Sequence, residues 1–166
     1  MVVPEIEELE EGEPELLVIE NARRKAHAGR ALAGDALTLG VDTEVALDGR
    51  VLGKPSHEAE ARAHLEALSA RDHEVLSGVV VLDSAIEGPI PVERSGIART
   101  QVTFNALDEP TIELYLSSGE WRGRAGGYAI QGLGSILIAG LQGDFSNVVG
   151  LPIALLLQLA PDLGEP

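Results

Sequence analysis

The spacing of apolar residues predicts helices and strands that alternate along most of the chain. Apolar positions recur at helical intervals from Pro14 to about Ala33, and proline suits a first helical turn because its missing N–H would have no partner there. Three further helices are predicted over residues 56–69, 108–118 and 150–159, the first with Ser56 as its N-cap. Apolar and β-branched runs predict strands over residues 37–47, 51–52, 75–82, 97–104, 136–141 and 148–149.

A hairpin interrupts this alternation. Asp48-Gly49 lies between two apolar runs and is a residue pair typical of a tight β-turn. The pattern therefore favours an α/β fold with a mixed sheet over a purely parallel sheet. The 166 residues show no repeat and no long linker, so we expect a single domain over residues 1–166. Residues 1–13 carry six glutamates, which predicts an acidic, partly disordered loop.

Composition narrows the class of partner. Twenty-seven acidic against twelve basic side chains give a net charge of −15, which argues against a nucleic acid or an anionic membrane surface. There is no cysteine, so disulfides, thiol nucleophiles and cysteine-ligated metals are excluded. No apolar run reaches the ~18 residues of a membrane span, and the acidic start does not resemble a signal peptide. We expect a cytoplasmic protein that binds neither nucleic acid nor membrane.

Three charged residues are candidates for chemistry. Asp42 follows an apolar strand, where a carboxylate can bind a hard cation or accept a proton from water; a carboxylate capping a bend would look the same. The chain has ten arginines but only two lysines, Lys25 and Lys54. Because a lysine is a compact point charge that arginine does not replace, these two positions are candidates for a role that needs such a charge. Lys54 lies in a Gly-Lys-Pro turn, where an exposed lysine is the usual case, and nothing in the basic helical patch around Lys25 separates that lysine from a solvated surface.

The strongest local signal is the glycine-rich loop from Gly126 to Gly132. Its glycines permit a close approach of the backbone to a ligand, and Gln131 offers the donor and acceptor groups needed to read the edge of a base. A plain turn between two elements is the alternative. The four histidines show no metal-binding spacing, and no serine lies in a Gly-x-Ser-x-Gly context, so a hydrolase triad is not expected.

Five segments together resemble one family. They are Asn-Ala-Arg-Arg-Lys-Ala (21–26), Val-Asp-Thr-Glu-Val (41–45), Leu-Gly-Lys-Pro (52–55), Ala-Gly-Gly-Tyr-Ala-Ile-Gln-Gly (125–132) and Asn-Val-Val-Gly-Leu-Pro (147–152). Their order and spacing resemble the Maf family of nucleoside triphosphate pyrophosphatases, named after a septum-formation phenotype, over essentially the whole chain. The last two segments are the specific ones. The glutamine-containing loop is similar to the branch that hydrolyses dTTP and UTP rather than 7-methyl-GTP.

The resemblance implies a fold and a set of site residues. The fold would be the elongated α/β fold of inosine triphosphate pyrophosphatases, with a mixed sheet and a cleft between two lobes. Asp42 matches the proton acceptor of the family, and Lys25 and Lys54 match its cleft lysines, so these three would be catalytic. The implied substrate-binding residues are Thr43, Arg124, Gln131 and Gly132. Asp42 and Glu8, or the neighbouring Glu7, would bind a divalent cation, Mg²⁺ or Mn²⁺.

The chain departs from the family pattern at its start. Family members begin with a strand, a Ser-x-Ser-Pro-Arg-Arg loop and a helix ahead of the region that matches Val2 to Glu8, which would add roughly 25 residues. Met1-Val-Val-Pro resembles mid-domain sequence, which favours a start assigned too late over a truncated, weakly active protein. A milder departure is Arg124, where many relatives carry a lysine; it keeps the charge but changes the donor geometry.

The activity implied is hydrolysis of dTTP, UTP or modified pyrimidine nucleotides to a nucleoside monophosphate and pyrophosphate, which cleans the nucleotide pool. Two alternatives stay open: a house-cleaning pyrophosphatase for ITP or XTP, and a catalytically impaired regulator of cell division. The family resemblance also implies a homodimer.

Overall fold

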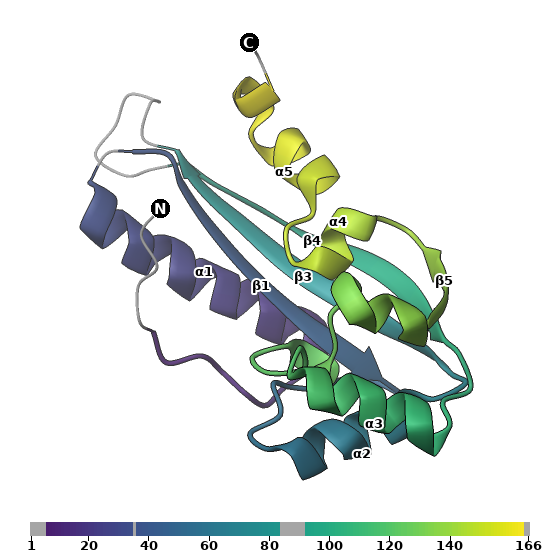
Figure 1. The fold of residues 1–166 in the computed structure, drawn as a ribbon. Helices are drawn as coiled ribbons and strands as arrows, with labels where there is room; N and C mark the ends of the chain where they lie inside the picture. Colours follow the sequence, from purple (N-terminus) through teal and green to yellow (C-terminus); the bar gives the residue numbers. More distant parts are fainter. Residues whose placement is uncertain (1–5, 35, 84–91, 165–166) are drawn as a thin grey trace.

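The computed structural model describes residues 6–34, 36–83 and 92–164, which form one five-stranded sheet with helices around it (Figure 1). The strands are β1 (Thr38–Leu47), β2 (Arg50–Leu52), β3 (Asp72–Asp83), β4 (Val92–Phe104) and β5 (Ile138–Gln142). The α-helices are α1 (Pro14–Ala33), α2 (Glu58–Leu68), α3 (Glu109–Ser118), α4 (Phe145–Val149) and α5 (Ile153–Leu159). Three short 3₁₀ helices, η1 (Ala125–Gly127), η2 (Gly132–Leu137) and η3 (Pro161–Gly164), complete the fold. The α/β class with flanking helices is confirmed.

Two local expectations were wrong. Residues 148–149 belong to α4 rather than to a strand, because Asp144 accepts a hydrogen bond from the N–H of Ser146 at 2.7 Å and starts a helical turn. His57 rather than Ser56 is the N-cap of α2, since its Nδ1 accepts the N–H of Glu60 at 3.1 Å.

The sheet has the order β2-β1-β3-β4-β5, and every neighbouring pair of described strands is antiparallel, so the expected mixed sheet is corrected. Helix α2 does connect two strands that run in the same direction, β2 and β3. Strand β1 lies between them in the sheet, however, and is antiparallel to both. Alternation of helices and strands therefore did not produce adjacent parallel strands here.

Helix α1 lies unusually close to one face of the sheet. A methyl group at Gly40 would lie 2.0 Å from the backbone oxygen of Ala22, and one at Gly78 would lie 2.3 Å from that of Val18. Gly40 on β1 and Gly78 on β3 lie close together in these two paired strands. Because neither has a side chain, they leave room for the helix backbone. The close approach brings the side chains of α1 within reach of polar groups on β1.

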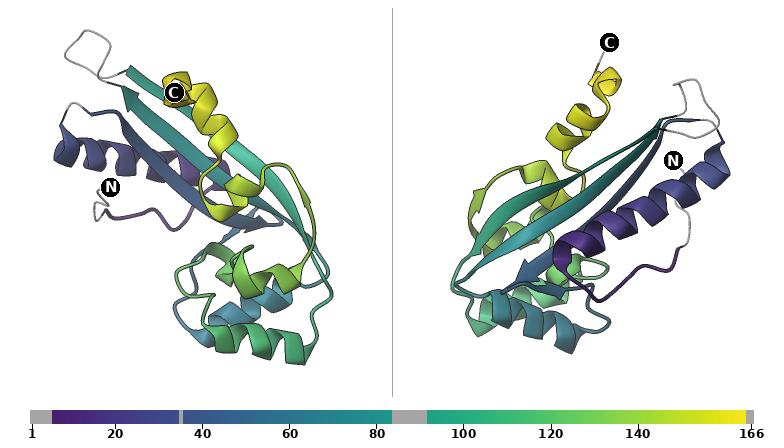
Figure 2. Two further views of the ribbon diagram at one scale, coloured as in Figure 1. Left: turned by 45° about the horizontal axis from the view of Figure 1, so that its top comes forward. Right: turned by 180° about the vertical axis from the view of Figure 1, so that it is seen from behind.

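Helix α5 covers part of the opposite face, so the two helices sandwich the sheet (Figure 2). Val79 and Val81 are buried on that face together with Ala160, and Leu155 and Leu159 of α5 pack against them. No described helix combines the length and the apolar character that crossing a membrane would require.

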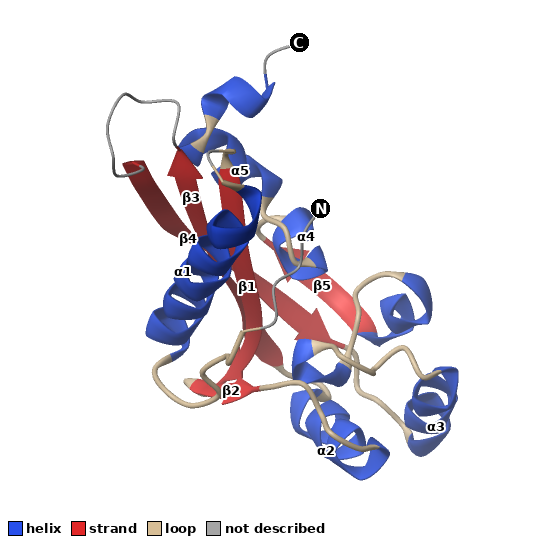
Figure 3. Cartoon of the chain, turned by 90° about the vertical axis from the view of Figure 1, so that its left-hand side faces the viewer, coloured by secondary structure: helices blue, strands red, loops and turns tan. Residues whose placement is uncertain are grey.

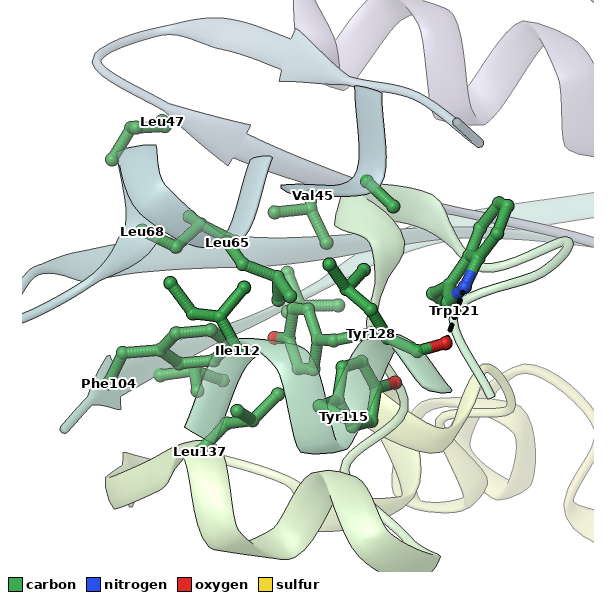
Figure 4. Packing of buried hydrophobic residues seen from close by; sticks show 14 residues of the cluster. Val45, Leu47, Leu65, Leu68, Phe104, Ile112, Tyr115, Trp121, Tyr128 and Leu137 are labelled. Carbon is green, nitrogen blue, oxygen red and sulfur yellow. Dashed lines mark hydrogen bonds between the residues drawn. The ribbon is translucent and has the colours of Figure 1, made fainter. Parts of the chain in front are cut away.

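A second packing unit lies at the end of the sheet away from α5, where α2 and α3 lie together (Figure 3). Its core combines the ends of β1, β3 and β4 with both helices and the loop that contains η1 and η2 (Figure 4). The largest side chains are Trp121, Tyr115 and Phe104, all at most 2% exposed. Tyr128 belongs to the same core, so four of the five aromatic residues of the chain anchor this unit and the glycine-rich loop beside it.

Candidate active site

A cavity of about 220 Å³ gathers six of the predicted site residues. It is bounded by α1, the middle of β1, the turn after β2, the loop around η1 and the end of α4. The predicted residues that line it are Lys25, Asp42, Thr43, Lys54, Arg124 and Gln131. These residues are separated by up to 106 positions in the sequence, and folding brings them to one cavity.

Asp42 is the most deeply buried charged group of the cavity, at 3% exposure. Its Oδ1 lies 2.5 Å from Nζ of Lys25, and its Oδ2 accepts a hydrogen bond from Nδ2 of Asn21 at 3.2 Å. Asp42 lies within β1 rather than at the end of its apolar run, and β1 continues to Leu47, as predicted for the strand over residues 37–47. Strand β2 pairs only with Val45 to Leu47, so no described strand covers the edge of β1 at Asp42. The cavity reaches the carboxylate at this open edge.

The two lysines share a second carboxylate, that of Glu8. Nζ of Lys25 lies 2.7 Å from Oε1 of Glu8, and Nζ of Lys54 lies 2.8 Å from Oε2. Burial alone would lower the pKa of Lys25, but hydrogen bonds to Asp42 and Glu8 outweigh it and raise that pKa. Burial likewise raises the pKa of Glu8, and hydrogen bonds from both lysines outweigh it and lower that pKa. Lys25 and Glu8 are therefore held in their charged forms.

Glu44 is a functional candidate that the sequence analysis missed. Residues two apart on a strand share a face, so Glu44 follows Asp42 on the side of α1. It is 7% exposed, and its Oε2 has no hydrogen-bond partner among the described residues. Burial first, and then the charge of Asp42, raise the pKa of Glu44 to about 7. The Asp-x-Glu alternation was the available signal.

Thr43 points to the other face of β1, on the side of the glycine-rich loop. Its hydroxyl lies 2.7 Å from Oγ of the fully buried Ser77, and Ser77 donates in turn to the backbone oxygen of Asn147 at 3.4 Å. Because Ser77 has one proton, both bonds form together only when Thr43 donates to Ser77. Asn147 belongs to the segment singled out in the sequence, and its place here is structural.

The glycine-rich loop is held by side chains from three directions. Tyr115 accepts the N–H of Ala129 at 3.0 Å, and the carboxylate of Glu120 accepts the N–H groups of Leu133 and Gly134 at 3.1 and 3.2 Å. Tyr128 is bound through its hydroxyl to Nε2 of His73 at 2.7 Å. These anchors leave Gln131 exposed at the mouth of the cavity.

Gly132 is not among the residues that line the cavity, although it directly follows Gln131, which does; its role in substrate binding stays a prediction. Its φ of +65° favours glycine, and a methyl group there would lie 2.7 Å from Oε1 of Glu120. Gly132 therefore leaves room for the Glu120 carboxylate, which binds the N–H groups of the next two residues.

His73 supports Tyr128, which lines the cavity, and was not singled out by the sequence. It is 2% exposed and packs edge-on against Phe104 and Tyr128. Burial lowers the pKa of His73 to about 4, so the ring is neutral near pH 7.

The described residues include no group of three or more acidic, histidine or cysteine side chains arranged to hold a metal ion. The carboxylates of Asp42 and Glu8 nevertheless flank the same ammonium group, that of Lys25. Mg²⁺ is commonly held by one or two protein carboxylates, with water and substrate phosphates as the other ligands. The donor set therefore fits a cation that arrives with a phosphate-bearing ligand.

Two lysine ammonium groups, one arginine and one glutamine carboxamide surround a single buried carboxylate in this cavity. The fold and the cavity together therefore define an α/β protein with a polar site for an anionic ligand. Residues 1–163 match the family model described as Maf-like protein. The chain belongs to this family, which confirms the resemblance found in the sequence.

Several relatives share much of the sequence. A dTTP/UTP pyrophosphatase of Deinococcus radiodurans is 43% identical over 164 residues, which are 99% of this chain and 81% of the relative. A protein of the same name from Moorella thermoacetica is 47% identical over 143 residues, covering 86% of this chain and 72% of the relative. Another, from Pyrococcus abyssi, is 42% identical over 146 residues, with 88% and 75% covered.

Proposed function

We propose that this protein hydrolyses nucleoside triphosphates, with dTTP and UTP preferred, to a nucleoside monophosphate and pyrophosphate. The observation that carries the proposal is the meeting of Asp42, Lys25, Lys54 and Gln131 at one cavity in a member of the Maf-like family. Relatives that are 42–47% identical are named dTTP/UTP pyrophosphatases. In this reaction, water attacks the α-phosphorus. The bond between the α-phosphorus and the oxygen that bridges it to the β-phosphorus breaks, and pyrophosphate leaves.

The charged residues have complementary roles in this proposal. Asp42 accepts a proton from the attacking water, and its buried position beside Lys25 fixes the direction of its oxygens. Lys25 and Lys54 neutralise charge that develops on the phosphates. A protein of charge −15 repels a triphosphate overall, so these local cations must supply the attraction.

A divalent cation, Mg²⁺ or Mn²⁺, is part of the proposal. Asp42 and Glu8 would hold it, and it would supply charge neutralisation at the triphosphate. When a triphosphate and its cation enter, the ion pairs of Glu8 with both lysines are the contacts that must be rearranged.

Base recognition is assigned to Gln131 and Thr43, which line the same cavity. The carboxamide of Gln131 can donate to one carbonyl of uracil or thymine and accept from a neighbouring N–H. Because Thr43 donates its proton to Ser77, its oxygen is left to accept a hydrogen bond from a ligand. A polar pocket rejects a mismatched base because its own groups are then left without partners.

The test is a panel of nucleoside triphosphates with detection of released pyrophosphate, in Mg²⁺ and in Mn²⁺. We expect dTTP and UTP to be hydrolysed fastest, and Asp42→Asn to lower turnover by a factor of about 10² or more. Asp48→Asn, on the exposed hairpin of the same strand, is the matched control and should keep full activity. Faster hydrolysis of ITP or XTP would assign the purine reaction instead, and an active Asp42→Asn variant would remove Asp42 from the mechanism.

A homodimer in the cytoplasm completes the proposal. The exposed apolar side chains Ile153 and Leu157 of α5 offer a surface for a second copy. Light scattering after size exclusion would give the mass in solution, and a monomer at every concentration would refute the dimer.

A further inference from the structure

The segment before α1 runs back along that helix and is tied to it at three successive residues (Figure 1). The backbone oxygen of Glu7 accepts a hydrogen bond from Arg24 at 3.2 Å. The carboxylate of Glu8 pairs with Lys25 on the same helix and with Lys54. The backbone of Leu9 binds the side chain of Asn21. The view from behind shows this segment beside α1 as well (Figure 2).

Asn21 makes the most buried of these ties. It is 0% exposed, and its Oδ1 accepts the N–H of Leu9 at 2.8 Å. Its Nδ2 donates to the backbone oxygen of Leu9 at 3.0 Å and to Oδ2 of Asp42 at 3.2 Å. Three hydrogen bonds thus use the carboxamide of Asn21: both of its amide protons are donated and its oxygen accepts one. Turning the carboxamide over would set oxygen against carboxylate and N–H against N–H, so the orientation is fixed.

Asn21 connects the two carboxylates of the site, because it binds Asp42 directly and binds Leu9, the residue next to Glu8. Asn21 and Lys25 are four residues apart on α1, so they lie on one side of the helix and bind the two oxygens of Asp42 separately. Glu8 precedes Leu9 directly, so a fixed Leu9 backbone places the Glu8 carboxylate beside Lys25. Arg24 could also position this segment, but its side chain is 39% exposed and makes a single hydrogen bond to it. Such an exposed contact contributes little to the position of the segment.

We propose that Asn21 is a positioning residue, which sets Glu8 and Asp42 in fixed places relative to each other by binding the Leu9 backbone and the Asp42 carboxylate with one carboxamide. This inference rests on the proposed function for its catalytic consequence, but the geometry it describes can be tested without turnover. Residues that orient the direct ligands of a reacting group commonly change activity by 10- to 100-fold when removed.

The first measurement is hydrogen exchange of the Leu9 amide. We expect Asn21→Ala to speed this exchange about tenfold, since its acceptor is lost. Asn21→Leu fills the same space with a good helix former, and it tests the same loss if the alanine variant is poorly folded. Asn147→Ala is the matched control: Asn147 is also 0% exposed and donates two hydrogen bonds, to Val75 and Thr100, but does not touch the segment. It should leave Leu9 exchange unchanged.

The second measurement is a double-mutant cycle on kcat/KM for UTP, with Glu8→Gln, Asn21→Leu and the double variant. If Asn21 places Glu8, the factor by which Glu8→Gln changes kcat/KM should shrink towards one once Asn21 is leucine. A cycle that pairs Glu8→Gln with Asn147→Ala should be additive. A purely structural role of Asn21 would lower stability without this coupling.

The outcomes separate the two proposals. Unchanged Leu9 exchange in both Asn21 variants, an equal increase in Asn147→Ala, or an additive Glu8–Asn21 cycle would each overturn the positioning role. A wild-type protein that hydrolyses no nucleoside triphosphate would overturn the proposed function, and Leu9 exchange would then decide the inference by itself.

Discussion

Glu44 should make the protein less stable as the pH rises, and Glu44→Gln should remove that effect. Burial and the neighbouring charge of Asp42 raise the pKa of Glu44 from 4.5 to about 7 in the folded protein. Between these two pH values the folded chain holds a proton at Glu44 that the unfolded chain has released. The free energy of unfolding must then fall with increasing pH, and the loss is complete above pH 7.

The size of the effect follows from the width of that window. From pH 4.5 to about 7 is roughly 2.5 pH units, and each unit corresponds to about 1.4 kcal/mol, so the loss is at most about 3.5 kcal/mol. Glutamine has nearly the same shape and no charge. We expect Glu44→Gln to match the wild type near pH 4.5 and to exceed it by about 1–3 kcal/mol at pH 8.

Urea unfolding at several pH values between 4.5 and 8 would measure this difference, without nucleotide or metal. Glu66→Gln, at an exposed position of α2, is the control and should follow the wild type at every pH. The comparison must be between variants because His73 contributes the opposite slope in an overlapping range. A Glu44→Gln variant whose advantage is the same at pH 5 and pH 8, or a wild type that is the more stable protein at pH 8, would refute the reasoning.

Three further predictions concern packing and the loop. Burial lowers the pKa of His73 from 6.5 to about 4, so stability should be lost as the pH falls through that range, by up to about 3.5 kcal/mol. His73→Gln, which can still form a hydrogen bond with Tyr128, should reduce this loss of stability at acid pH in urea unfolding, and an unchanged loss would contradict the prediction. Gly40→Ala should cost about 3 kcal/mol or more in the same assay, because its methyl group would lie 2.0 Å from the Ala22 backbone, whereas Gly53→Ala has open space and should cost less than about 1 kcal/mol. Glu120→Ala frees the N–H groups of Leu133 and Gly134, which directly follow the glycine-rich loop, and should raise KM for UTP about tenfold with a smaller change in kcat. Equal losses in both constants would disprove this prediction.

The sequence by itself determined most of the elements and the site residues that carry chemistry. Helix α1 was predicted from its apolar spacing and from Pro14, and the β1–β2 hairpin from Asp48-Gly49. These are local signals, because period and turn chemistry depend on residues close together in the chain. The motifs also identified Asp42, both lysines and Gln131, since a family pattern records which residue types a site needs, although not how they are held.

Tertiary structure decided what depends on contacts between distant segments. No local rule sets strand direction when a helix connects two strands across a third, so the antiparallel sheet was missed. Burial of a single side chain is likewise a property of the whole fold: Asn21 reads as one polar residue of a helix, Glu44 as an ordinary strand position, and Gly132 as part of a ligand loop. Only when α1 packs against β1 does Asn21 bind the Asp42 carboxylate and Glu44 lose its solvent, and only when Glu120 binds beside the loop does Gly132 lie against a carboxylate.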